Sequence, residues 1–189
     1  MTHVRREVER SAAPVFRSWL DSLGDAALPN FGFASRAEAR SARLLMPIPY
    51  VLPPRKLALR ELETFLAEAP GVWLVPAAVG TRVVCLVSVN AAPGERVEAV
   101  EFGKTWAANR LDAGIRAAGS PPQEQWSGFR IVTFVSPRIE LLAFRGGDRK
   151  WKWWRLTGAE QASASPLSNR ELTALLAGMG EPERDLLNP

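Results

Sequence analysis

The stretch Arg82-Val83-Val84-Cys85-Leu86-Val87-Ser88-Val89-Asn90 is the most hydrophobic strand candidate of the chain. Five of the six residues from Val83 to Ser88 are apolar, and turn signals stand on both sides of the stretch. Gly80-Thr81 precedes it, and Ala92-Pro93-Gly94-Glu95 follows it. A short apolar run between turn signals is typical of a strand inside a sheet. The sequence therefore predicts that residues 82–90 form a central strand.

Five further strands are predicted around this one from alternating apolar residues and flanking turns. They cover residues 72–77, 96–102, 129–136, 138–144 and 149–156. Pro76 places the first of them at an edge or at a strand end. Because short turns join most of these segments, we expect one mostly antiparallel sheet of five to six strands.

Apolar residues at helical spacing predict three helices that cover this sheet. They span residues 55–69, 104–118 and 169–179, and the second crosses between the two halves of the sheet. A capping box at Ser168 and Glu171 opens the third helix. Residues 3–24 are also predicted to be helical, with a second helix possible from Ser11 and Pro14. A short helix is expected from Ser35 to about Leu45.

Residues 46–54 contain four prolines in nine positions, which argues against a helix and against a central strand. We therefore expect an extended connector that lies against the fold. The resulting division is an N-terminal helical arm (1–45), a proline-rich connector (46–54), a single α+β domain (55–180) and a flexible tail (181–189).

Composition limits the class of protein. The chain has 189 residues, of which 47% are hydrophobic, and a formal net charge of +4. This length suits one domain that needs neither disulfides nor a metal for stability. A single cysteine excludes an intrachain disulfide framework and fits a reducing compartment. The sequence contains no apolar run of about 18 residues and no signal-peptide pattern, so we predict a cytoplasmic location.

The sequence offers few residues for catalysis. The single histidine is His3, and Cys85 lies in an apolar strand where a thiol is inert. Common phosphate-binding, zinc and nucleophile motifs are absent. We therefore predict no cofactor and no metal, and favour a protein without enzymatic activity. One alternative is a small enzyme that uses the strand carboxylates of Glu98, Glu101 and Glu140.

A second feature of that alternative is a possible anion site at the predicted start of the helix over 104–118. Lys104 and Thr105 follow Gly103 at this point, and a helix N-terminus can hold an anion. The glycine that would complete a phosphate-binding loop is missing, because position 98 is Glu98.

The stretch from Arg145 to Arg155, RGGDRKWKWWR, combines three tryptophans with five basic residues and one acid. On a strand, Trp151 and Trp153 share one face, and Lys152 and Trp154 share the other. Either Trp151 and Trp153 pack under a helix, with a bulge near Trp154, or they face outward beside basic residues. We favour packing under a helix. The candidate binding residues are Arg149, Trp151, Lys152, Trp153, Trp154 and Arg155.

These observations favour a non-enzymatic binding or scaffolding module that acts through a protein partner or through self-association. The main alternative is a single-stranded nucleic-acid binder, because exposed tryptophans beside basic residues stack bases and contact phosphates. A membrane partner is disfavoured.

Overall fold

A computed structural model describes residues 2–54, 57–67, 70–92, 96–102, 105–135, 139–157, 161–163 and 165–179. Residues 181–189, predicted as a tail, lie outside these ranges. The described helices are α1 (Thr2–Ser22), η1 (Asp25–Phe31), α2 (Arg36–Ser41), α3 (Leu59–Phe65), α4 (Thr105–Ala117), η2 (Gln123–Gly128) and α5 (Asn169–Gly178). The described strands are β1 (Arg43–Leu44), β2 (Ile48–Val51), β3 (Val72–Val79), β4 (Arg82–Asn90), β5 (Glu98–Phe102), β6 (Phe129–Phe134), β7 (Ile139–Arg145), β8 (Trp151–Thr157) and β9 (Gln161–Ala162).

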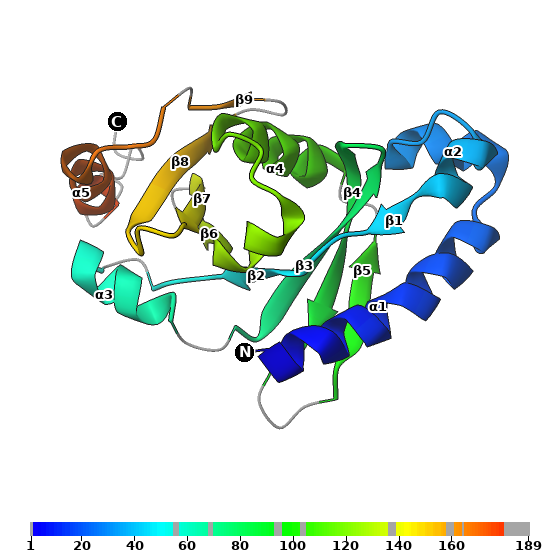
Figure 1. Ribbon diagram of the computed structural model, residues 1–189, viewed down its shortest axis with the longest axis horizontal. Coiled ribbons are helices and arrows are strands. Elements are labelled where there is room, and N and C mark those ends of the chain that lie inside the picture. The colour runs from blue at the N-terminus through cyan, green and yellow to red at the C-terminus, as the bar shows by residue number, and fades with distance from the viewer. Residues whose placement is uncertain are drawn as a thin grey trace, which may run out of the picture.

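All nine of these strands belong to one sheet, which is larger than the predicted five or six (Figure 1). The order across the sheet is β5-β4-β3-β2-β6-β7-β8-β9, and β1 pairs with β3. The pairing is antiparallel except between β2 and β6, which are parallel. The α+β class is confirmed, and the three additional strands are the short segments β1, β2 and β9.

The proline-rich segment contains a strand at the middle of the sheet, which corrects the expectation of a connector outside it. β2 pairs with β3 from Ile48 to Tyr50 and with β6 at Tyr50 and Val51. The pairing with β6 begins one residue after Pro49, so the missing N–H of that proline falls outside it. Proline excludes a donor, but it does not exclude an extended backbone.

β3 is an interior strand, although Pro76 predicted an edge. On one side it pairs with β4 along its whole length. On the other side, β1 pairs with Ala77 and Ala78, and β2 pairs with residues 72–74. Pro76 lies in the gap between these two short partners, where no ladder bond from its nitrogen is needed.

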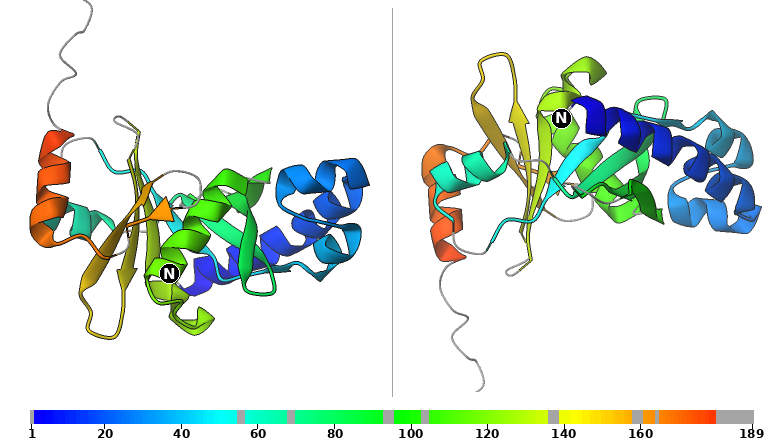
Figure 2. Two further views of the ribbon diagram at one scale, coloured as in Figure 1. Left: turned by 90° about the horizontal axis from the view of Figure 1, so that it is seen from above. Right: turned by 90° about the horizontal axis from the view of Figure 1, so that it is seen from below.

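Both faces of the sheet are covered by helices. α4 packs on one face, where the side chains of Leu74, Leu86 and Leu111 belong to one apolar cluster. The opposite face carries two groups of helices at its two ends (Figure 2). α1, η1 and α2 pack on β3 and β4 around Trp73, and α3 and α5 pack on β6 to β8 around Trp153. This double cover explains why the strands are apolar on both faces.

The N-terminal helix is continuous, which corrects the possible break at Ser11 and Pro14. Both residues lie inside α1. The Ser11 hydroxyl donates to the carbonyl of Val97 at 3.3 Å and caps no helix. α1 buries Phe16 and Leu20 on the sheet, and this packing offsets the backbone bond that Pro14 removes.

The helix expected over 55–69 is shorter and begins at Leu59. The described residues Leu57 and Ala58, which precede it, are not helical. The N–H of Ala58 donates to the Glu61 carboxylate at 2.7 Å, which fixes this start. The capping box of α5 is confirmed, since the Ser168 hydroxyl accepts from the N–H of Glu171.

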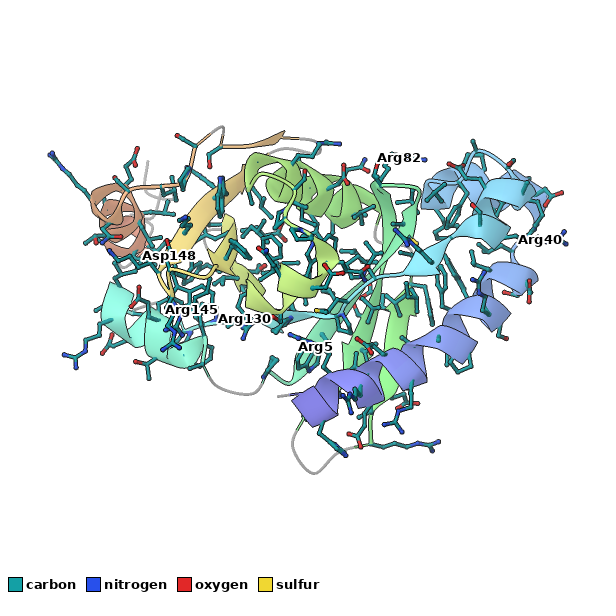
Figure 3. The ribbon with its side chains drawn as sticks, viewed as in Figure 1. Arg5, Arg40, Arg82, Arg130, Arg145 and Asp148 are labelled. Carbon is teal, nitrogen blue, oxygen red and sulfur yellow. The ribbon has the colours of Figure 1, made fainter. Side chains whose placement is uncertain are left out.

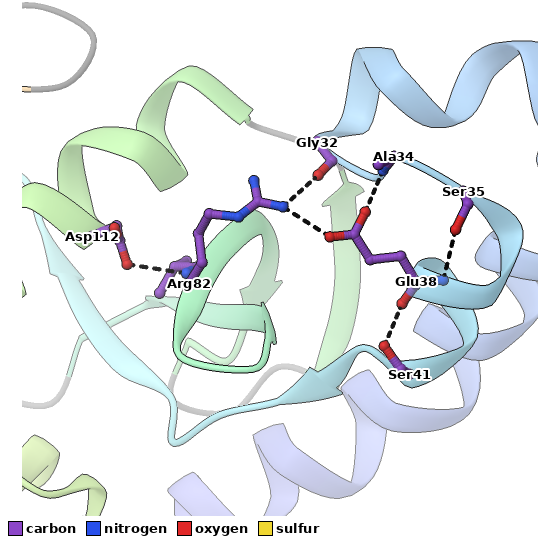
Figure 4. Close-up of polar contacts among 8 residues, drawn as sticks. Gly32, Ala34, Ser35, Glu38, Ser41, Arg82 and Asp112 are labelled. Atoms are coloured by element: carbon purple, nitrogen blue, oxygen red, sulfur yellow. Dashed lines mark hydrogen bonds and ion pairs between the residues drawn. The ribbon is translucent and has the colours of Figure 1, made fainter.

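Polar contacts attach η1 and α2 to β4 (Figure 4). Arg82 donates to the Glu38 carboxylate at 3.0 Å and to the carbonyl of Gly32 at 3.4 Å. Gly32 has φ +82, and a Cβ there would come within 2.8 Å of the Val84 carbonyl oxygen. The close approach of η1 to β4 therefore requires glycine at this position.

The burial of Cys85 can be tested through the pH dependence of stability. Burial raises the pKa of its thiol from 9.0 to about 12. The unfolded chain releases the thiol proton above about pH 9 while the folded chain retains it, so stability falls as pH rises through this window. From about pH 9 to about pH 10, the wild-type protein should lose about 1 kcal/mol more than Cys85→Ala in guanidinium denaturation. Parallel losses would contradict a buried thiol.

Candidate binding groove

The tryptophans of β8 lie on both faces of the sheet. Trp153 is 1% exposed and packs in the cluster that contains Leu172 and Leu176 of α5. Trp154 is 4% exposed and packs in the cluster under α4. The β7–β8 pairing runs without a register shift from Glu140–Leu156 to Arg145–Trp151, so the expected bulge is wrong. Each face of β8 buries one of these tryptophans, because helices cover both faces of the sheet.

Trp151 is partly buried and lies between basic side chains. The guanidinium carbons of Arg130 and Arg145 are 5.9 Å and 5.7 Å from the centre of its ring. Both distances are within the range of a cation–π interaction. The ring centre of Trp153 lies 6.1 Å from the ring centre of Trp151. Trp151 therefore holds two arginines in place at the end of the strand.

Arg130 is the buried member of a row of three arginines. Its side chain donates to the carbonyls of Ser127 at 2.9 Å and Phe129 at 2.7 Å. Its pKa is lowered to about 10, mainly by burial and further by the charges of Arg5 and Arg145. Figure 3 shows these three arginines following one another across the molecule. Positive charge is therefore present both at the exposed Arg145 and at the buried Arg130.

A groove of about 510 Å³ opens beside Trp151. It lies between α3, the β7–β8 turn and the first residue of α5. Its lining residues are Arg60, Glu63, Thr64, Arg145, Arg149, Lys150, Trp151 and Asn169. Four of them are basic and one is acidic, so this groove, which we call the basic groove, has a strong excess of positive charge. Such a concave basic surface attracts anionic groups.

Hydrogen bonds within the β7–β8 turn involve three of these basic residues. The Arg145 side chain donates to the carbonyl of Arg149 at 2.7 Å, and the N–H of Arg149 donates to Gly146 at 3.1 Å. The N–H of Lys150 donates to the Asp148 carboxylate at 3.2 Å, which is the main reason that the pKa of Asp148 is lowered. Asp148 also pairs with Lys152 at 3.4 Å. The Asp148 carboxylate is therefore already bound to Lys150 in the turn and to Lys152 on β8.

The predicted binding residues are thus divided. Arg149 and Trp151 line the groove, whereas Trp153 and Trp154 are buried. Lys152 and Arg155 are exposed but do not belong to the lining. Lys104 lies outside the described residues, and the side chain of Thr105, at the start of α4, is not described either. The anion site predicted there stays a prediction.

The three strand carboxylates come from two strands that are not neighbours in the sheet. Glu98 and Glu101 lie on β5, and Glu140 lies on β7, with four strands between them. Glu140 is 8% exposed and pairs with Arg110 of α4 at 2.9 Å. Across the described ranges, no three His, Cys, Asp or Glu side chains form a group that could hold a metal ion. Nor is any helix there long and apolar enough to cross a bilayer.

Four lining residues were not predicted from the sequence, namely Arg60, Glu63, Thr64 and Asn169, and neither was Arg130 beside Trp151. Arg60 and Asn169 carry no local signal, because they reach the groove through the packing of α3 and α5 on the sheet. Arg130 did carry one, since it is the single charged residue of the apolar strand β6. A basic residue in a buried strand needs partners, and this one finds backbone carbonyls and the ring of Trp151.

Comparison with known proteins adds no relative. The chain matches no protein-family model, no curated protein and no solved structure.

Proposed function

We propose that this protein is a non-enzymatic binding module whose basic groove binds an acidic segment of a partner protein. The observation that carries the proposal is the lining of the groove, where Arg60, Arg145, Arg149 and Lys150 face a single carboxylate, Glu63. Complementary charge at such a surface speeds association and selects acidic partners.

The burial of two tryptophans of β8, and the arginines beside the third, favour a polypeptide ligand over single-stranded nucleic acid. Base stacking needs exposed aromatic faces. Trp153 and Trp154 are buried, and two guanidinium groups lie close to the ring of Trp151. The surface therefore offers charge and hydrogen-bond donors rather than a series of stacking platforms.

Fluorescence anisotropy with a labelled decaglutamate peptide at low salt tests this function. The double charge reversal Arg149→Glu/Lys150→Glu should weaken binding by about tenfold, because two attractive contacts become repulsive. Arg155→Glu is the control, since Arg155 is exposed on β8, the strand that follows these two residues, but does not line the groove. We expect this control to bind like the wild type.

Two results would contradict the proposal. In one, the charge reversal and the control have equal affinity for the peptide. In the other, labelled decathymidylate binds more tightly than decaglutamate and loses its affinity with the same charge reversal. The second result would establish the nucleic-acid alternative, with an affinity that falls steeply as salt rises.

A further inference from the structure

We infer that the acidic segment binds as an extended strand added to the outer edge of β8 at Trp151. This inference rests on the proposed function and specifies its binding mode. Strand addition supplies main-chain hydrogen bonds for affinity, while side chains beside the strand supply specificity.

The outer edge of β8 is covered over part of its length. β9 pairs with β8 at Leu156 and Thr157. Beyond β9, the N–H of Ser163 donates to the carbonyl of Arg155 at 2.9 Å, and the N–H of Leu167 donates to the carbonyl of Trp153 at 2.7 Å. The chain then leaves the edge and enters α5 at Asn169.

Residues 161–167 leave the edge of β8 uncovered at Trp151, which is the first residue of the strand. Alternate residues of a strand direct their backbone groups to the same side. Since Trp153 and Arg155 use that side for the segment 163–167, Trp151 also directs its N–H and carbonyl outward. Within the described ranges, these two groups and the N–H of Trp153 have no backbone partner on that side. Among the parts of the chain that the structure describes, nothing pairs with these groups, so they offer a pairing site for one further strand.

The open edge and the basic groove meet at the same residue. Trp151 carries the open backbone groups and also lines the groove, and Arg149 and Lys150 precede it directly. Acidic side chains on an added strand would therefore lie beside these cations. The same cations disfavour a second copy of this chain, because two such edges would place like charges together. The occupant is thus an acidic polypeptide in extended form.

Backbone N-methylation of the peptide tests this mode directly. The probes are a labelled decapeptide of alternating Glu and Thr, and two derivatives methylated on every Glu nitrogen or on every Thr nitrogen. All three have the same charge. Because an added strand directs alternate N–H groups towards its neighbour, one derivative should lose at least about tenfold in affinity and the other should bind like the parent. Hydrogen exchange should slow at the amides of Trp151 and Trp153 when the parent binds.

The possible outcomes separate the binding mode from the function. Equal affinity of all three peptides, or equal loss for both derivatives, would overturn strand addition. If strand addition fails while Arg149→Glu/Lys150→Glu still weakens decaglutamate binding, the proposed function stands without it. If the protein alone forms dimers whose formation protects the Trp151 amide, the occupant is a second copy and the inference is wrong.

Discussion

Replacing Trp153 with alanine lowers the free energy of unfolding by about 3–5 kcal/mol, the range for a large aromatic side chain removed from a packed core. Trp153 is 1% exposed and lies between the sheet and α5. Its removal leaves a cavity beside Leu141, Leu172 and Leu176 that the rigid strand cannot close. Denaturant unfolding followed by far-ultraviolet circular dichroism measures the loss without depending on tryptophan fluorescence.

Trp151→Ala is the matched control, because Trp151 lies on the same strand and face but is partly exposed. We expect a loss of about 1–2 kcal/mol, since less apolar surface returns to water. Equal losses from the two substitutions would contradict the placement of Trp153 in the core. Trp151→Ala should also weaken decaglutamate binding, whereas mild destabilisation alone leaves the affinity of the folded protein unchanged.

The second large effect is expected at the ion pair between Glu140 and Arg110. Glu140→Ala should cost about 3 kcal/mol, because it removes the carboxylate of a largely buried, charge-assisted contact with Arg110. The side chains of Arg110 and Glu140 are 14% and 9% exposed, and their closest N–O distance is 2.9 Å. The pair therefore fixes α4 to β7 through a contact that is largely shielded from water.

A double replacement separates the charges of this pair from its packing. The variant Glu140→Leu/Arg110→Met replaces both charges by apolar groups of similar size, and it should lose much less stability than Glu140→Ala. Leucine suits position 140 because Glu140 borders a small apolar cavity lined by Leu74, Leu86 and Leu156. A double variant that is less stable than Glu140→Ala would show that the charges themselves stabilise the fold.

Local patterns predicted the elements whose partners are close in sequence. β4 was predicted with its observed bounds, because its apolar run and the Gly80-Thr81 turn are both local. The start of α5 was also predicted correctly, because Ser168 and Glu171 fix it locally, and the helix ends at Gly178, one residue before the predicted end. β2 was missed because its four residues have no turn of their own, and their partners in β3 and β6 lie far along the chain.

The groove was predicted in part for the same reason. Arg149 and Trp151 lie in one conspicuous stretch, so composition alone drew attention to them. Alternation along β8 was not sufficient to decide which tryptophans are buried, because that depends on which helices cover each face. Arg60 and Asn169 complete the groove only after α3 and α5 have packed on the sheet.

The position of β2 also has a consequence for how the chain assembles during synthesis. Tyr50 pairs with Ile131, and β3, β4, β5 and α4 all lie between these two residues in the chain. Each half of the sheet contains hairpins that can form from neighbouring segments, but β2 lacks one neighbour until β6 has left the ribosome. Closing so long a loop is slow, since the entropy is lost before the new contacts form. Until then β2 has an unpaired edge, and the nascent chain is exposed there to pairing with other chains.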